Sequence, residues 1–189
     1  AAVLRAGYTC VNVNPLYTAR ELEHQLKDSG ATAIVILENF CHTLAEVLDH
    51  TAVKHVVVAS MGDLLGFWYG RWITFAVRHL AKMVPAYRLS LANGRTVTPF
   101  AQALQQGGPL PLKPTQQTLD SVAFLQYTGG TTGLSKGAVL THGNIVAAIL
   151  QAEAWFTPAL GRVGDVSRVN SIAALPLYHI FALTLSLLA

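Results

Sequence analysis

The sequence predicts an α/β protein in which a mainly parallel sheet is flanked by helices. Over residues 11–58 the patterns alternate strand–helix–strand–helix–strand, an order typical of parallel sheets with helical crossovers. Ala33–Leu37 is a continuous β-rich run, as in a strand buried on both faces. Hydrophobic residues make up 52% of the 189 residues, enough for one good-sized core.

The first half of the chain has clear helix boundaries. Thr18 followed by Glu21 fits a capping box, and Gly30 suits a left-handed cap at the end of the same helix. The other elements expected here are a strand at Val11–Val13 closed by Asn14-Pro15, the strand Ala33–Leu37, a helix at Asn39–His50 and a buried strand at Val56–Val58.

Leu64–Val84 differs from its surroundings because it is rich in Trp, Phe and Leu. Its cations Arg71, Arg78 and Lys82 would share one face of a single helix. Such a helix, within an amphipathic segment at 61–90, suits docking at a bilayer interface. It suits equally well an ordinary helix whose charged face is in water, and the sequence leaves both interpretations open.

A Gly- and Pro-rich linker at 107–118 separates a first α/β portion, 1–106, from a second portion, 119–189. Before the linker, Thr98-Pro99 is expected to cap and begin a short helix through Gln106. The elements expected after it are a strand at Val122–Tyr127, a glycine-rich loop, a strand at Ala138–Thr141 and a helix at Ile145–Phe156 capped by Asn144.

Composition limits the partners and the compartment. Charged residues are only 12%, against roughly 25% in typical soluble domains, and the chain opens without Met, so we expect an internal piece of a longer protein. A net charge of +3 without a Lys/Arg run argues against nucleic acid. Cys10 and Cys41 lack partners at metal-ligand spacing, and we expect reduced, buried thiols of a cytosolic protein.

The carboxyl-terminal run Ser171–Ala189 contains no Asp, Glu, Lys or Arg and has the length of a membrane span. Pro176 and His179 would interrupt such a helix and place a polar ring in lipid. We therefore expect a buried strand, a turn and the start of a buried helix.

The segment that carries chemistry is the glycine-rich loop with its flanks. It consists of Tyr127, Thr128, Gly129, Gly130, Thr131, Thr132, Gly133, Leu134, Ser135, Lys136, Gly137 and Ala138. The glycines let the backbone come close to a ligand, and successive N–H groups can converge on an anion. Four hydroxyl groups and the ammonium of Lys136, without an acidic residue, suit a polyphosphate.

Two common nucleotide motifs do not fit this loop. A Walker A loop needs Lys followed by Ser or Thr and a helix, whereas Lys136 precedes Gly137 and a predicted strand. The dinucleotide pattern G-x-G-x-x-G is missing as well. By composition alone, a Gly/Thr-rich surface hairpin remains the alternative.

The order of residues resembles the phosphate-binding loop of the adenylate-forming superfamily, which includes acyl-CoA synthetases, luciferases and peptide-synthetase adenylation domains. Ser135-Lys136-Gly137 matches the end of the family loop, and Leu140–Asn144 is similar to its continuation. Leu175–Phe181 is similar to the family's Pro-x-x-His segment at the acyl pocket. Val11–Ala31 is similar to bacterial long-chain fatty acid–CoA ligases in particular.

The resemblance implies that residues 1–189 are part of the large N-terminal domain of such an enzyme, without its C-terminal domain. It implies ATP-dependent formation of a fatty acyl-adenylate and transfer of the acyl group to coenzyme A. Thr128–Lys136 would clamp the β- and γ-phosphates. The candidate catalytic residues are Lys136, which would offset charge on pyrophosphate, and His179, which would border the acyl pocket.

The same resemblance places the remaining machinery, including the Mg²⁺ ligand, the adenine and ribose contacts and the thioesterification residues, downstream of Ala189. No metal ligand is therefore expected within the chain. Two alternatives stay open: adenylation of an aromatic or amino acid, and a non-catalytic nucleotide- or membrane-binding module. The expected location is cytoplasmic. Peripheral contact with the inner face of the membrane through residues 64–84 stays open, as does formation of a homodimer.

Overall fold

The computed structural model describes residues 1–128, 135–162 and 175–184, and the chain divides into two units. The parallel-sheet unit consists of residues 15–112. The loop unit joins residues 1–14 to residues 113–189. The later boundary lies inside the expected linker at 107–118, whereas residues 1–14 group with the second half rather than with the portion 1–106.

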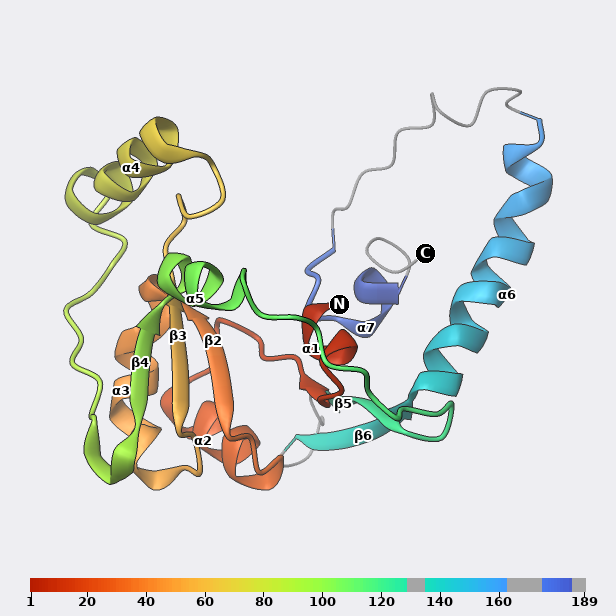
Figure 1. The fold of residues 1–189 in the computed structure, drawn as a ribbon, viewed down its shortest axis with the longest axis horizontal. Coiled ribbons are helices and arrows are strands. Elements are labelled where there is room, and N and C mark those ends of the chain that lie inside the picture. The colour runs from red at the N-terminus through yellow and green to blue at the C-terminus, as the bar shows by residue number, and fades with distance from the viewer. Residues whose placement is uncertain (129–134, 163–174, 185–189) are drawn as a thin grey trace. The chain divides into compact units, whose positions relative to one another are not determined.

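The parallel-sheet unit is built on three parallel strands in the order β2-β3-β4 (Figure 1). The strands are β2 at Ala33–Leu37, β3 at His55–Ala59 and β4 at Thr96–Pro99. In register, Val57 of the central strand pairs with Val35 on one side and Thr98 on the other. The predicted α/β class with a parallel sheet is confirmed.

Strand β4 replaces the helix start that was expected at Thr98-Pro99. The β-branched residues Thr96, Val97 and Thr98 extend the sheet beside β3. Pro99 is the last residue of this edge strand. Proline has no backbone N–H to donate, and it is tolerated at an edge because an edge strand pairs on one side only. Helix α5, Phe100–Gly107, follows.

The helices before the sheet's second strand behave largely as predicted. Helix α2, Ala19–Asp28, begins with the capping box, in which the backbone N–H of Thr18 donates to Glu21 Oε2 at 2.8 Å. Gly30 has φ +63°, as expected of a left-handed cap. The predicted 39–50 helix consists of α3, Cys41–Val47, between 3₁₀ turns at Glu38–Phe40 and Leu48–His50.

Strand β2 is buried on one face only, so the expectation of burial on both faces is wrong for the described chain. Ile34 is 9% exposed, whereas Val35 is 62% exposed. Successive side chains of a strand point to opposite faces, and this edge strand is covered only on the side of Ile34.

Residues 64–84 do not form one continuous α-helix. Helix α4 spans Phe67–Phe75 and continues as a π-helical turn, Ala76–Leu80. Lys82 lies beyond this turn with φ +50°, so the expected cationic stripe through Lys82 is wrong. A 3₁₀ turn at Ala92–Gly94 then leads into β4, and α4 and α5 both lie beyond the carboxyl ends of the strands (Figure 1).

The loop unit has a mixed sheet in the order β1-β5-β6. The short strand β1, Cys10–Val11, runs parallel to β5, Val122–Thr128, and β6, Lys136–Thr141, runs antiparallel to β5. Helices α1, Ala2–Arg5, α6, His142–Leu160, and α7, Ile180–Ala182, complete the unit. Its core cluster contains Ala123, Phe124, Ile145 and Leu183.

Helix α6 starts three residues before the predicted position. The side chain of Thr141 accepts from the backbone N–H of Asn144 at 3.2 Å, and Asn144 Oδ1 accepts from the N–H of Thr141 at 2.9 Å. This reciprocal capping box makes Thr141 the N-cap, and Asn144 is the third helical residue. Among the described residues, none of the helices has the length and apolarity needed to cross a membrane.

Candidate functional site

The strands on either side of the glycine-rich loop pair with each other, so they form the base of a hairpin. Thr128, the last residue of β5, lies opposite Lys136, the first residue of β6. Both are exposed, and Ser135 between them and the loop is half-buried. A hydroxyl and an ammonium group are thus placed at the base of the loop. Gly129, Gly130, Thr131, Thr132, Gly133 and Leu134 lie outside the described residues.

The strand predicted after Lys136 is confirmed, and its first glycine has a packing role. Gly137 lies opposite Tyr127, whose side chain is buried. A Cβ at position 137 would be 3.0 Å from Cε2 and Cζ of that ring and 3.3 Å from its Oη. Only glycine therefore fits beneath Tyr127 without displacing the ring. Ala138, the next residue, is exposed.

His179 is presented at the amino-terminal end of the short helix α7. Its backbone N–H donates to Pro176 O at 2.9 Å, which closes a turn, and its own carbonyl accepts from Leu183 N at 3.0 Å. The imidazole-bearing residue is exposed, whereas Ala182 and Leu183 are buried in the core of the loop unit. The turn and helix start expected within Ser171–Ala189 are confirmed for residues 175–184, whereas residues 171–174, where the expected strand would begin, and residues 185–189 lie outside the described part of the chain.

A buried amide joins this segment to the strand that leads into the loop. Gln126 of β5 is 7% exposed. Its Nε2 donates to Tyr178 O at 3.1 Å, and its Oε1 accepts from Asn12 Nδ2 at 3.3 Å. Sequence reasoning missed both amides; a glutamine inside an otherwise apolar strand, two residues before Thr128, was the available signal.

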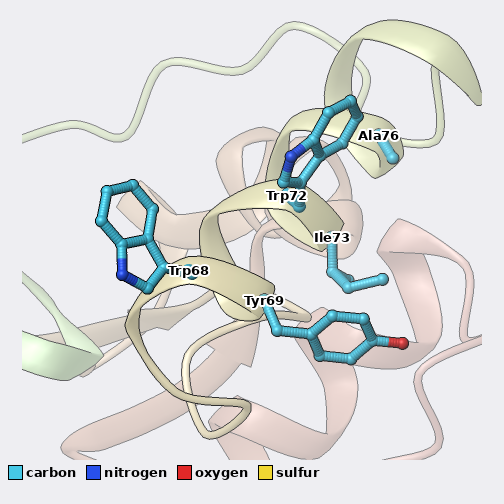
Figure 2. Close-up of a pocket in the computed structure, with 5 residues that line it drawn as sticks. All are labelled: Trp68, Tyr69, Trp72, Ile73 and Ala76. Atoms are coloured by element: carbon cyan, nitrogen blue, oxygen red, sulfur yellow. The ribbon is translucent and has the colours of Figure 1, made fainter.

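Helix α4 presents exposed aromatic side chains in the other unit. They lie around an open, shallow hollow of about 430 Å³, formed by Trp68, Tyr69, Trp72, Ile73 and Ala76 (Figure 2). Trp68 and Trp72 are 79% and 66% exposed. The helix therefore carries an exposed apolar surface.

The cations of this helix have partners. The guanidinium of Arg71 lies 5.4 Å from the centre of the Phe67 ring. Arg78 Nε donates to Glu38 Oε2 at 2.7 Å, and Arg78 Nη2 donates to the same oxygen. Because Glu38 is only 1% exposed, this pair holds the π-helical turn against the 3₁₀ turn Glu38–Phe40 that precedes α3.

Both cysteines are free thiols, and Cys41 is buried while Cys10 is half-buried. Burial raises the pKa of the Cys41 thiol to about 11, helped by the nearby Glu38 carboxylate. Burial also raises the pKa of Cys10. Among residues 1–128, 135–162 and 175–184, no group of three or more His, Cys, Asp and Glu side chains could hold a metal ion.

Residues 1–189 match the family described as AMP-binding enzymes. The chain belongs to this family. The match includes β5, β6 and the His179 segment, so both motifs of the candidate site lie within AMP-binding sequence. It confirms the resemblance to adenylate-forming enzymes.

Relatives of this AMP-binding chain include two named long-chain-fatty-acid–CoA ligases. The protein of Escherichia coli O157:H7 is 48% identical over 186 residues, which are 98% of this chain and 32% of the relative. That of Haemophilus influenzae is 50% identical over 187 residues, again 98% and 32%. The chain spans about a third of the length of these relatives.

Solved structures share the fold of this AMP-binding chain. A long-chain-fatty-acid-CoA ligase from Archaeoglobus fulgidus matches with a TM-score of 0.56 and 24% identity, covering 97% of this chain and 28% of its own. The adenylation domain of a carboxylate reductase from Mycobacterium chelonae matches with a TM-score of 0.53 and 20% identity, and the match covers 77% of this chain and 21% of that structure's chain.

Proposed function

We propose that this chain supplies the phosphate-binding loop and one side of the acyl site of an ATP-dependent long-chain-fatty-acid–CoA ligase. The observation that carries the proposal is the base of the loop, where exposed Thr128 and Lys136 lie opposite each other at the end of the β5–β6 ladder. Identities of 48% and 50% to proteins named for this activity support the choice of substrate.

The chemistry of this class needs charge neutralisation on ATP. The fatty acid carboxylate attacks the α-phosphorus, an acyl-phosphate bond forms, and the bond to the β-phosphate oxygen breaks to release pyrophosphate. The thiol of coenzyme A then displaces AMP. Lys136 offsets negative charge on the departing pyrophosphate, and the hydroxyl group of Thr128 donates a hydrogen bond beside it. Such positioning and electrostatic stabilisation supply much of the rate enhancement.

His179 borders the site where the carboxylate meets the α-phosphate. Its exposure and its position at the start of α7 support this role, since the anchored helix leaves the imidazole available. ATP would arrive with Mg²⁺, but the described residues offer no fitting cluster. We infer from the family resemblance alone that the metal ligand belongs to another part of the full-length protein, and we derive no step through the metal.

Pyrophosphate exchange by the full-length protein tests this function. Exchange of labelled pyrophosphate into ATP is expected with long-chain fatty acids and not with aromatic or amino acids. Coenzyme A should then convert the adenylate to acyl-CoA. Exchange with an aromatic or amino acid alone would assign another carboxylate, and ATP binding without exchange would favour a non-catalytic module.

His179→Ala provides a second test within the same assay. We expect it to weaken acid activation while leaving the affinity for ATP nearly unchanged, because the residue lies in a segment separate from the loop strands. Equal loss of ATP binding, or unfolding of the variant, would favour a structural role for this histidine.

We propose in addition that the enzyme is cytoplasmic and contacts the inner face of the membrane through α4. The exposed Trp68 and Trp72 side chains support this proposal, because aromatic residues favour the headgroup region of a bilayer. A cationic stripe does not contribute to this contact, since Arg78 is engaged with Glu38. Contact with a membrane would give the enzyme access to a poorly soluble substrate.

Vesicle co-sedimentation of the full-length protein tests the membrane contact. The double variant Trp68→Ser/Trp72→Ser should bind vesicles less than wild type. Trp155→Ser is the matched control, because Trp155 is 81% exposed on α6 in the loop unit. Equal loss in the control would remove the assignment to α4. Loss of a dimer, detected by sedimentation without vesicles, would instead assign the aromatic surface to a homodimer contact.

A further inference from the structure

The side chain of Gln126 connects β5 to the His179 segment by a hydrogen bond. Gln126 belongs to the strand that ends at Thr128, where the phosphate-binding loop begins. Its amide nitrogen donates to the carbonyl of Tyr178, the residue directly before His179. The bond therefore links the two candidate site segments, which are far apart in the sequence.

The geometry of Gln126 is fixed from both ends. Its oxygen accepts a hydrogen bond from Asn12, the residue directly after β1. Strand β1 lies beside β5 on the side opposite to β6. Because the oxygen is committed to Asn12, the amide nitrogen is directed toward Tyr178. Leaving a buried polar group of this kind unpaired destabilises the fold, so the hydrogen-bond network favours one orientation of the Tyr178 carbonyl.

The residues after His179 are held separately by apolar packing. Leu183 belongs to the same core cluster as Phe124 of β5, and Ile180 packs against that cluster. Apolar packing fixes the depth of α7 against the sheet but leaves the direction of the preceding peptide groups less restricted, since such contacts are not directional. The hydrogen bond from Gln126 supplies the directional constraint.

We propose that Gln126 is a positioning residue, which keeps His179 in register with the phosphate-binding loop by holding the carbonyl of Tyr178. This inference rests on the proposed function, because it assumes that both segments face the same reaction. Asn12 supports the arrangement by orienting the Gln126 amide. Gln126 itself touches neither ATP nor the fatty acid.

Two variants of the full-length protein separate this role from simple stability. Gln126→Glu keeps an oxygen for Asn12 but loses the amide donor to Tyr178, and Gln126→Met loses both bonds. Ile145→Val is the matched control, because it removes one methyl group from the same core without touching the network. Fatty acid-dependent pyrophosphate exchange is measured over a range of ATP concentrations up to saturation, below the unfolding temperature of every variant.

Both Gln126 variants should lower kcat for exchange by about 10- to 100-fold, the size expected of a misplacement approaching 1 Å, with KM for ATP unchanged. In a His179→Ala background the same substitutions should add less than about threefold, since residues that act through one another are not additive. Full additivity with His179→Ala, an equal loss in Ile145→Val, or a matching rise in KM for ATP would overturn the proposal.

A readout that does not depend on activity keeps this inference distinct from the proposed function. The ring resonances of His179 in histidine-labelled protein, assigned by their loss in His179→Ala, should shift or broaden in both Gln126 variants and remain in place in Ile145→Val. Unchanged His179 resonances in the Gln126 variants would refute the positioning role even if the wild type is an active ligase. Absence of exchange in the wild type would refute only the ligase assignment.

Discussion

Replacing Gly137 by alanine tests the packing at the base of the phosphate-binding loop. The new Cβ would lie 3.0 Å from two ring carbons of Tyr127, whereas carbon–carbon contacts are favourable at about 3.5–4.0 Å. The ring or strand β6 must therefore move by a few tenths of an ångström. Tyr127 is 7% exposed, so little free space exists, and overpacking of this kind destabilises by about 1–3 kcal/mol.

The displacement should affect ATP more than the fatty acid. Tyr127 directly precedes Thr128, and Gly137 directly follows Lys136, so movement of either strand changes the spacing of the two exposed donors. A misplacement of about 1 Å can reduce a rate by roughly 100-fold. Because the shift is only a few tenths of an ångström, we expect Gly137→Ala to raise KM for ATP and to lower kcat/KM for ATP by up to about 10-fold in pyrophosphate exchange by the full-length protein.

Gly107→Ala is the control for a glycine-to-alanine change in general. It lies at the end of α5, and a Cβ there would meet nothing within 4 Å. The control should keep full activity and gain up to about 1 kcal/mol of stability. Combining Gly137→Ala with Tyr127→Leu should give a smaller defect than the sum of the two, because the shorter side chain relieves the contact. Wild-type kcat/KM for ATP in Gly137→Ala would refute this reasoning.

Three further predictions follow from single side chains. Lys136→Ala should slow adenylation by the equivalent of roughly 2.7–4 kcal/mol with little change in unfolding temperature; wild-type turnover at saturating ATP would contradict its assignment. Since the pKa of Cys41 rises from 9.0 to about 11, alkylation of the native thiol should be slow at pH 8 and accelerate about tenfold per pH unit. The stability linked to this thiol is full below pH 9.0 and declines as the pH rises towards 11; rapid alkylation at pH 8 would contradict its burial. Arg78→Met should lower the free energy of opening of the π-helical turn, measured by hydrogen exchange, by about 1–3 kcal/mol. This is less than for a fully buried ion pair, because Arg78 is half exposed. The control Arg71→Met, at an exposed position, should change this free energy less.

Features set by neighbours in the sequence were predictable. The capping box at Thr18 needs only the residue three positions later, and the left-handed turn at Gly30 needs only the absence of a Cβ. The strand after Lys136 followed from β-branched and apolar residues beside the loop. The same kind of local information led to the prediction of a phosphate-binding loop, since its donors are contiguous in the sequence.

Features set by distant partners were not predictable from local patterns. Strand β4 exists because Thr96–Pro99 pairs with β3, and the pattern of Thr98-Pro99 alone favoured a helix start. The helix at 64–84 is interrupted by a π-helical turn whose Arg78 reaches Glu38, forty positions earlier. The prediction of Asn144 as the cap also misplaced the start of α6, because Asn144 is a good N-cap in isolation but here serves as the capping-box partner of Thr141.

The candidate site combines both kinds of information, so its residues could be proposed from the sequence but the hydrogen bonds that support them could not. Lys136 and His179 lie in short motifs that can be recognised one at a time. Their relative position depends on Gln126, whose two partners are 114 and 52 positions away. Asn12 lies in residues 1–14, which belong to the same unit as the second half of the chain. These residues therefore support the strands that flank the loop and are not part of the parallel-sheet unit.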